Sequence, residues 1–103
     1  MKGYEFIEER LREFLKSAGR CGMSQGYIRY AAMFAFADSA KPHLETHHVL
    51  PRCCGGTNDP MNLISVTKDH HTKLHKMILS SELSDDERGR LKYAYLRRIG
   101  KKF

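Results

Sequence analysis

The sequence is poor in cysteine, and its three cysteines do not form the framework of a metal or disulfide site. Cys53 and Cys54 are adjacent and Cys21 stands alone, so neither Cys-x-x-Cys spacing nor a set of four ligands is present. An odd number of cysteines without a secretory signal favours a reducing cytosol. We therefore expect no structural zinc, a cytoplasmic protein, and no redox role for Cys53 and Cys54.

Long apolar runs are also missing. The longest run, Tyr30–Ala37, is far too short to span a bilayer, and the mixed acidic and basic N-terminus does not resemble a signal peptide. No repeat or low-complexity segment interrupts the 103 residues, whose hydrophobic content of 41% supports a modest core. These features predict one small, soluble, intracellular domain with no membrane partner.

The end of the chain lacks acidic residues. The formal net charge is +6, of which segments 1–44 and 45–79 contribute +2 and +1. After Glu87 every charged residue is basic: Arg88, Arg90, Lys92, Arg97, Arg98, Lys101 and Lys102. The alternative is a solvated helix face, but we favour contact with the phosphates of a polyanion, which would add affinity rather than sequence recognition.

Histidine, by contrast, is concentrated in one part of the chain, because all six histidines lie between His43 and His75. Around them, β-branched runs, a loop rich in glycine, asparagine and proline, and a helical pattern follow one another. The predicted elements are a strand at 45–51, a loop at 52–60, a strand at 62–67, and a helix at 68–79 that begins after Thr67 or Ser65. The sequence thus predicts a compact ββα unit.

His71 and His75 are four residues apart on the predicted helix, so their imidazoles share one face and can bind the same divalent ion. Alone this is weak evidence, because such pairs on surface helices are more often solvated. A third ligand has to come from another element. The first strand supplies candidates in His47 and His48.

The pattern His47-His48, Asn62, His71-x-x-x-His75, together with the Pro-Arg and Gly-Gly pairs between them, closely resembles the HNH (ββα-metal, or His-Me finger) endonuclease motif. The resemblance covers about a third of the chain. The run is most similar to free-standing homing endonucleases of bacteriophages, and the ligand set is similar to that of colicin-type DNases. It implies a protein of the bacterial cytosol, encoded by a phage.

The resemblance implies a role for each matched residue. His47, where many relatives carry aspartate, becomes the first metal ligand, and His71 and His75 become the others. His48 becomes the general base that deprotonates the attacking water, a task that suits an imidazole near neutral pH. Asn62 becomes the catalytic-motif asparagine that braces the hairpin through hydrogen bonds.

The implied cofactor is one divalent metal ion, which would offset the charge that develops on a phosphodiester during hydrolysis. Three histidines suit zinc, nickel or manganese, whereas cellular abundance favours magnesium. We expect Mg2+ or Mn2+, with Zn2+ or Ni2+ as alternatives.

Adjacent residues of a regular strand point to opposite faces, so His47 and His48 cannot both address one site from an ideal strand. We expect the strand to bend or end there, near Pro51.

Two other histidines and one arginine lie beside the motif. We interpret His43 as a loop residue, and His70 as a solvent or phosphate contact, because it lies about 100° round the helix from His71. Arg52 is a candidate phosphate ligand, with an ordinary exposed loop arginine as an equal alternative.

The first of the remaining elements is an amphipathic helix at 4–18, with Glu8 and Arg12 paired on its polar face and Gly19 and Gly22 at its end. Its apolar face is Tyr4, Ile7, Leu11, Phe14, Leu15 and Ala18. A second helix is predicted at 25–37, capped by Ser24. Its apolar part at 30–37 has to be buried. We favour burial within the domain over a homodimer interface.

A last helix is predicted from the capping box Ser84-Asp-Asp-Glu87 to about Ile99, with Leu91, Tyr95 and Ile99 on one face. The fold class is therefore α+β, with a two-stranded antiparallel hairpin plus helix flanked by two N-terminal helices and one basic C-terminal helix. We divide the single domain 1–103 into a helical part at 1–40, the ββα-metal motif at 44–79, and the basic helix at 84–103.

The resulting hypothesis is a divalent-metal-dependent HNH endonuclease that hydrolyses DNA, of the phage homing type. A non-catalytic metal- and nucleic-acid-binding module and a colicin-like toxin DNase are the alternatives. The first would retain DNA without nicking it, and the second would degrade DNA without site preference.

Overall fold

The computed structural model describes residues 3–20, 23–79 and 84–98. In chain order its elements are α1 (Gly3–Ser17), α2 (Gln25–Asp38), β1 (Glu45–His48), the 3-10 turns η1 (Arg52–Cys54) and η2 (Pro60–Asn62), β2 (Leu63–Val66), α3 (Lys68–Ile78) and α4 (Asp85–Arg98). Together they form the expected α+β architecture. Cys21, Gly22, Ile99, Lys101 and Lys102 lie outside the described residues, as do the side chains of Tyr95 and Arg98.

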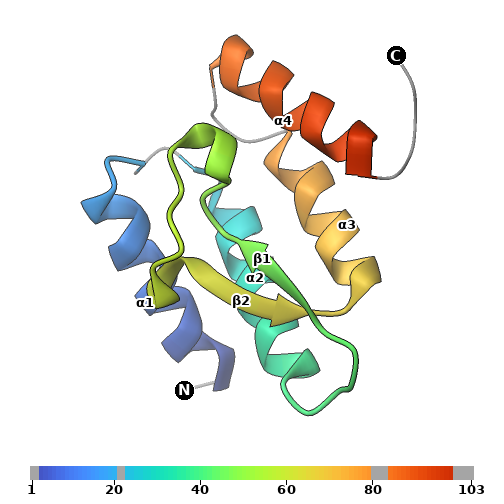
Figure 1. Cartoon of the computed structure of the whole chain (residues 1–103). Helices are drawn as coiled ribbons and strands as arrows, with labels where there is room; N and C mark the ends of the chain where they lie inside the picture. Colours follow the sequence, from blue (N-terminus) through green and yellow to red (C-terminus); the bar gives the residue numbers. More distant parts are fainter. Residues whose placement is uncertain (1–2, 21–22, 80–83, 99–103) are drawn as a thin grey trace.

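The β1–β2 hairpin lies in front of α2 in Figure 1, with α1 and α3 on either side of it and α4 near η1 at the top of the view. The strands are antiparallel, with Glu45 opposite Val66 and His48 opposite Leu63. Within the described residues β1 pairs with β2 alone, and it also contacts α3.

Helix α2 is the centre of the core. Its buried apolar residues are Tyr27, Ile28, Ala31 and Ala32, and it packs against α1, β2 and α3. The hydroxyl of Ser24 accepts a hydrogen bond from the amide of Tyr27, which confirms the predicted N-cap. The expectation that 30–37 is buried holds only in part, because Tyr30 is 46% and Phe36 52% exposed.

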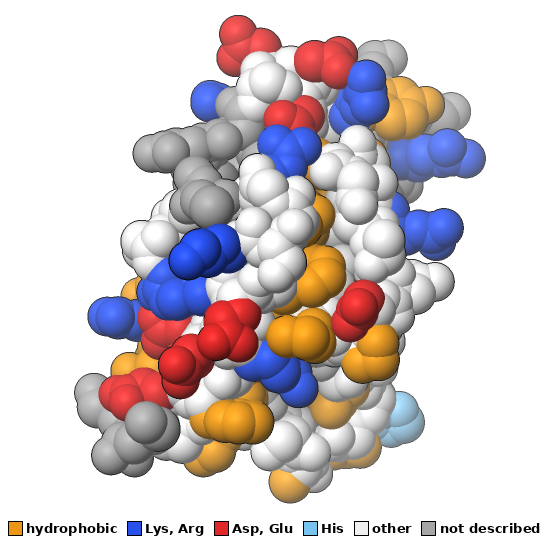
Figure 2. Space-filling view, turned by 90° about the vertical axis from the view of Figure 1, so that its left-hand side faces the viewer, with side chains coloured by type: hydrophobic (Ala, Val, Ile, Leu, Met, Phe, Trp, Pro, Cys, Tyr) orange, Lys and Arg blue, Asp and Glu red, His pale blue; other side chains and the backbone are white. Residues whose placement is uncertain are grey.

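Four large hydrophobic side chains are exposed among the described residues: Phe6, Tyr30, Phe36 and Tyr93. On the side of the molecule that carries α1, Figure 2 shows hydrophobic side chains interspersed with acidic and basic ones. Such a mixture is ordinary for a protein surface. The homodimer interface at 30–37 stays a prediction.

Helix α1 differs from its sequence-based prediction at two positions. Glu8, expected on the polar face, is buried, and Ala18, expected on the apolar face, is exposed because the helix ends at Ser17. Arg12 donates to Glu8 at 2.5 Å, as the i,i+4 spacing predicted, and Arg29 of α2 donates to the same carboxylate at 3.4 Å. These two arginines give the buried carboxylate its partners.

The first strand is shorter than predicted, ending at His48 rather than Pro51. The amide of Val49 still bonds to the carbonyl of Asn62, but the amide of Leu50 bonds instead to the Asn62 side chain. Pro51 has no amide hydrogen to continue the ladder. The second strand starts at Leu63 rather than at the predicted Asn62, because Asn62 lies in η2.

A buried carboxylate joins α2 to the start of α3. Asp38 accepts hydrogen bonds from the amide of Thr67 at 2.9 Å, from His70 Nδ1 at 2.6 Å, and from Lys41 at 2.9 Å. Burial raises the pKa of Asp38, but these hydrogen bonds outweigh it and lower the pKa from 3.8 to about 2. The expectation that His70 contacts solvent or phosphate holds only in part, because its ring bonds to Asp38 and stacks on Phe34 at 4.0 Å while its side chain stays 26% exposed.

Helix α4 begins at the predicted capping box. The amide of Glu87 donates to the Ser84 hydroxyl at 3.2 Å, and the Glu87 carboxylate accepts from the Ser84 amide at 3.4 Å. Arg20 also donates to both carboxylate oxygens of Glu87, and to the carbonyl of Cys54 at 3.3 Å. The hydrogen bonds from Arg20 and Ser84 lower the pKa of Glu87, although burial opposes them. Arg20 thus connects α4 to η1.

Among the described helices, none combines the length and the apolar composition that crossing a membrane requires.

Candidate metal centre

Three of the predicted site residues come together in one cluster. His47 from β1 and His71 and His75 from α3 each place a ring nitrogen within 4.8 Å of the others. His47 is fully buried and His71 is 3% exposed. The cluster lies where α3 contacts β1.

The histidines of α3 are oriented by the way the helix starts. Thr67 caps it by accepting a hydrogen bond from the amide of His70, and the spacing of four residues stacks His71 and His75. Their Nε2 atoms are 3.1 Å apart. Two nitrogens that bind one tetrahedral metal at 2.0–2.1 Å lie about 3.3 Å from each other, so the pair fits a shared ion.

Two further side chains contact the cluster from outside. The Glu45 carboxylate lies 2.8 Å from Nδ1 of His71, and the Tyr27 hydroxyl lies 2.9 Å from Nε2 of His47. Tyr27 also donates to the carbonyl of Val49 at 2.5 Å. Burial, and secondarily the charge of Cys54, raises the pKa of the Tyr27 hydroxyl well above its ordinary value. The phenol therefore remains a neutral hydrogen-bonding group.

His48 lies on the opposite face of β1 from His47, as strand alternation requires. It lines a cavity of about 390 Å³ together with His71 and His75. His71 and His75 thus belong both to the cluster with His47 and to the lining of the cavity with His48. Nε2 of His48 lies 2.8 Å from Oδ1 of Asn58.

Asn62 is fully buried, and its side chain bonds to the backbone of the loop. Its Oδ1 accepts from the amide of Leu50 at 2.7 Å, while its Nδ2 donates to the carbonyls of Leu50 at 3.1 Å and Thr57 at 2.8 Å. These three bonds fasten the end of β1 to the start of β2. These bonds are consistent with a structural role, and Asn62 is not among the residues that line the cavity.

The cavity has a second wall that carries the basic helix. Besides the histidines, its lining includes Thr46, Pro51, Arg52, Cys53, Leu91 and Ala94. Leu91 and Ala94 belong to α4, so the candidate nucleic-acid-binding helix borders the histidine cavity. Of the predicted contacts, Arg52, Arg88, Arg90, Lys92 and Arg97 are exposed, and Arg90 pairs with Asp86 at 2.7 Å.

The two described cysteines differ in their surroundings. Cys53 lines the cavity, whereas Cys54 packs in the core. Burial first, and the neighbouring Cys53 second, raise the pKa of the Cys54 thiol to about 12. Cys54, which the sequence suggested was only a loop residue, therefore also packs in the core.

His43 lies in the loop before β1, exposed and with a φ of 57°.

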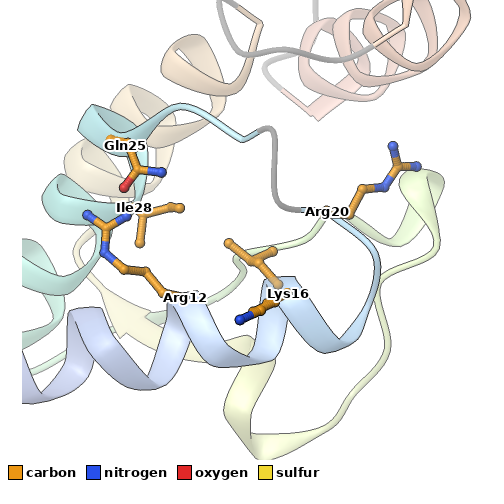
Figure 3. Close-up of a pocket in the computed structure, with 6 residues that line it drawn as sticks. Arg12, Lys16, Arg20, Gln25 and Ile28 are labelled. Atoms are coloured by element: carbon orange, nitrogen blue, oxygen red, sulfur yellow. The ribbon is translucent and has the colours of Figure 1, made fainter.

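A second cavity, of about 260 Å³, lies between α1 and α2. Figure 3 shows Arg12, Gln25 and Ile28 close together there, with Arg20 directed away from them. Arg12 and Arg20 already have carboxylate partners in Glu8 and Glu87. This cavity has no histidine in its described lining.

Sequence reasoning missed three residues that touch the site: Tyr27, Glu45 and Asn58. Glu45 was detectable, because residues two apart on a strand share a face and Glu45 precedes His47 by two. Asn58 belongs to a loop, and Tyr27 lies 20 residues before His47 in a different element. No local pattern indicates their contacts.

The fold and the cluster together define an α+β protein with a candidate metal site built on a ββα unit. Two curated proteins of Enterobacteria phage T4 are similar to this chain. "Probable mobile endonuclease B" is 44% identical over 36 residues, which are 35% of this chain and 14% of the relative. "Probable mobile endonuclease E" is 35% identical over 52 residues, which are 48% of this chain and 37% of the relative.

The chain therefore spans less than half the length of either relative. No protein-family model matches it, and neither does any solved structure.

Proposed function

We propose that this protein is a divalent-metal-dependent HNH endonuclease that hydrolyses DNA phosphodiester bonds, of the kind encoded by mobile elements of phages. The observation that carries the proposal is the cluster of His47, His71 and His75 beside a cavity that His48 also lines. The similarity to two phage proteins named as mobile endonucleases supports it independently.

His47, His71 and His75 would hold the ion. A divalent cation bound there supplies Lewis-acid stabilisation of the charge that develops on the scissile phosphate. Three nitrogen ligands leave coordination positions for phosphate and water, which is the mark of a catalytic rather than a structural site. The nitrogen donor set is compatible with zinc, nickel and manganese. The cleavage assay below compares their activity with that of magnesium.

In this proposal His48 takes a proton from the attacking water, whose oxygen bonds to phosphorus while the ester P–O bond breaks. An imidazole exchanges protons near neutral pH and suits this role. Asn58 contacts the ring of His48 at 2.8 Å and so limits its orientation. Asn62 holds the loop between the strands and does no chemistry.

Arg52 and the exposed basic residues of α4 would bind phosphates on either side of the cut. Arg52 lines the histidine cavity and α4 borders it through Leu91 and Ala94, so a backbone that enters the cavity passes Arg52 and runs beside the basic helix. Phosphate contacts add affinity without reading bases. The recognition of a particular target sequence therefore requires contacts beyond these.

Cleavage of supercoiled plasmid tests the proposal. Wild-type protein should nick or linearise the plasmid with at least one of Mg2+, Mn2+, Ni2+ and Zn2+, and chelator should abolish the reaction. His48→Ala should lower the rate by about 100- to 10,000-fold, the range for loss of a general base. His43→Ala, which changes an exposed histidine outside the cavity, is the matched control and should cut like wild type.

An intact plasmid with all four ions would contradict the enzyme assignment, and DNA retention in that case would favour the non-catalytic module. Equal rates for His48→Ala and wild type would contradict the assignment of the base.

A further inference from the structure

We propose that Tyr27 of α2 and Glu45 of β1 position the metal ligands, by determining which nitrogen of His47 and of His71 faces the ion. The inference rests on the proposed metal centre and adds to it two residues that do not bind the ion themselves. One of them, Tyr27, lies outside the ββα unit. The helical N-terminal part of the chain would therefore be a component of the site.

Tyr27 determines the tautomer of His47 through its single hydroxyl proton. The carbonyl oxygen of Val49 can only accept, and at 2.5 Å it takes that proton. Towards His47 the hydroxyl then offers a lone pair, so Nε2 of His47, 2.9 Å away, has to donate its own hydrogen. In a neutral ring the other nitrogen, Nδ1, is the basic one, and it is the atom that binds a cation.

Glu45 determines the tautomer of His71 in the same way. An ionised carboxylate only accepts hydrogen bonds, so Nδ1 of His71, 2.8 Å away, carries the hydrogen. Nε2 of His71 is then basic, and this is the atom that lies 3.1 Å from Nε2 of His75. A carboxylate behind a ligating histidine fixes its ring and strengthens it as a ligand.

The two positioning residues differ in their freedom to adjust. The Tyr27 side chain is fully buried and held at a second point by Val49, whereas the Glu45 side chain is 34% exposed. Water can replace part of what Glu45 provides, but no water reaches the position of the Tyr27 hydroxyl. We expect the loss of Tyr27 to have the larger effect.

Metal affinity tests this inference without depending on cleavage. Titration calorimetry with Zn2+ and Mn2+ on metal-stripped protein should give a dissociation constant about 10- to 100-fold weaker for Tyr27→Phe, the usual cost of losing such a partner. Glu45→Ala should also bind more weakly. Glu45→Gln, which can still accept the hydrogen bond, should lie between Glu45→Ala and wild type.

Tyr30→Phe and Glu13→Gln are the matched controls, since both positions are exposed, and they should bind like wild type. Nitrogen-15 NMR of the metal-free wild type supplies a readout that folding defects in the variants cannot affect. It should show the ring hydrogen of His47 on Nε2 and that of His71 on Nδ1.

The reverse tautomers, or affinities of Tyr27→Phe and Glu45→Ala within twofold of wild type, would overturn the inference alone. A wild type that binds neither ion would overturn the proposed metal centre, and the inference with it.

Discussion

Asn62 holds together the loop that connects the two strands. Replacing it with alanine leaves the buried amide of Leu50 and two carbonyls without the side chain they bond to. A buried polar group left unsatisfied costs roughly 1–3 kcal/mol. We therefore expect Asn62→Ala to lower the free energy of unfolding by about 3 kcal/mol, as measured by urea denaturation.

Asn58→Ala is the control from the same loop, because Asn58 is exposed. It should change the free energy of unfolding by less than about 0.5 kcal/mol. Equal destabilisation by the two variants would show that Asn62 is not the brace.

Gly55 and Gly56 are both required, for different reasons. A Cβ on Gly56 would lie 1.8 Å from the carbonyl oxygen of Leu50, so the loop would have to move. Gly55 has open space around it but a φ of +93°, where a side chain costs about 1–2 kcal/mol. We expect Gly56→Ala to destabilise the fold more than Gly55→Ala in the same urea assay. The opposite order would contradict this account of the loop.

At the scale of elements, Asp38 couples the end of α2 to the start of α3. Its pKa in the folded chain, about 2, lies below its ordinary value of 3.8. The carboxylate therefore stabilises the fold above about pH 4, and this stabilisation is lost as the pH falls towards 2. The shift corresponds to a contribution on the order of 2 kcal/mol.

Asp38→Asn tests this coupling. The difference in the free energy of unfolding between wild type and Asp38→Asn should be largest at pH 5 and above, and should shrink towards pH 2. Denaturation curves at several pH values measure it. A difference independent of pH would mean that the Asp38 charge does not stabilise the junction of α2 and α3.

The position of α4 on the cavity wall predicts how it affects DNA binding. In a His48→Ala background, which slows cutting, Lys92→Gln and Arg97→Gln should weaken binding to any short duplex. Each should also reduce the slope of log affinity against log salt by about 0.9 if the residue contacts one phosphate. Fluorescence anisotropy at several salt concentrations measures both quantities.

Lys16→Gln is the control for this experiment. Lys16 is an exposed basic residue of α1 that lines the second cavity rather than the histidine cavity. It should leave the affinity and the salt slope unchanged. Equal effects of the α1 and α4 variants would mean that α4 contributes only overall positive charge to DNA binding.

At the scale of the whole molecule, the sequence predicted the features that local patterns determine. Ser24 and Ser84 cap their helices as expected, and Thr67, one of two candidates, caps α3, because a cap involves residues three apart. The four-residue spacing of His71 and His75 likewise predicted their approach. Contacts between distant segments were not predictable in this way: Asp38 with His70 is one case, and Tyr27 with His47 is another. The early end of β1 was not predictable from a local pattern either, since it depends on a contact with the Asn62 side chain across the loop.

The most direct test of the central claim is a crystal structure of the zinc-loaded protein, with anomalous diffraction to locate the ion. The account predicts one peak per chain, about 2.0–2.1 Å from Nδ1 of His47 and from Nε2 of His71 and His75, with His48 beside the ion but not bound to it. The absence of a peak at this cluster, or an ion bound to His48 in place of His47, would contradict the account.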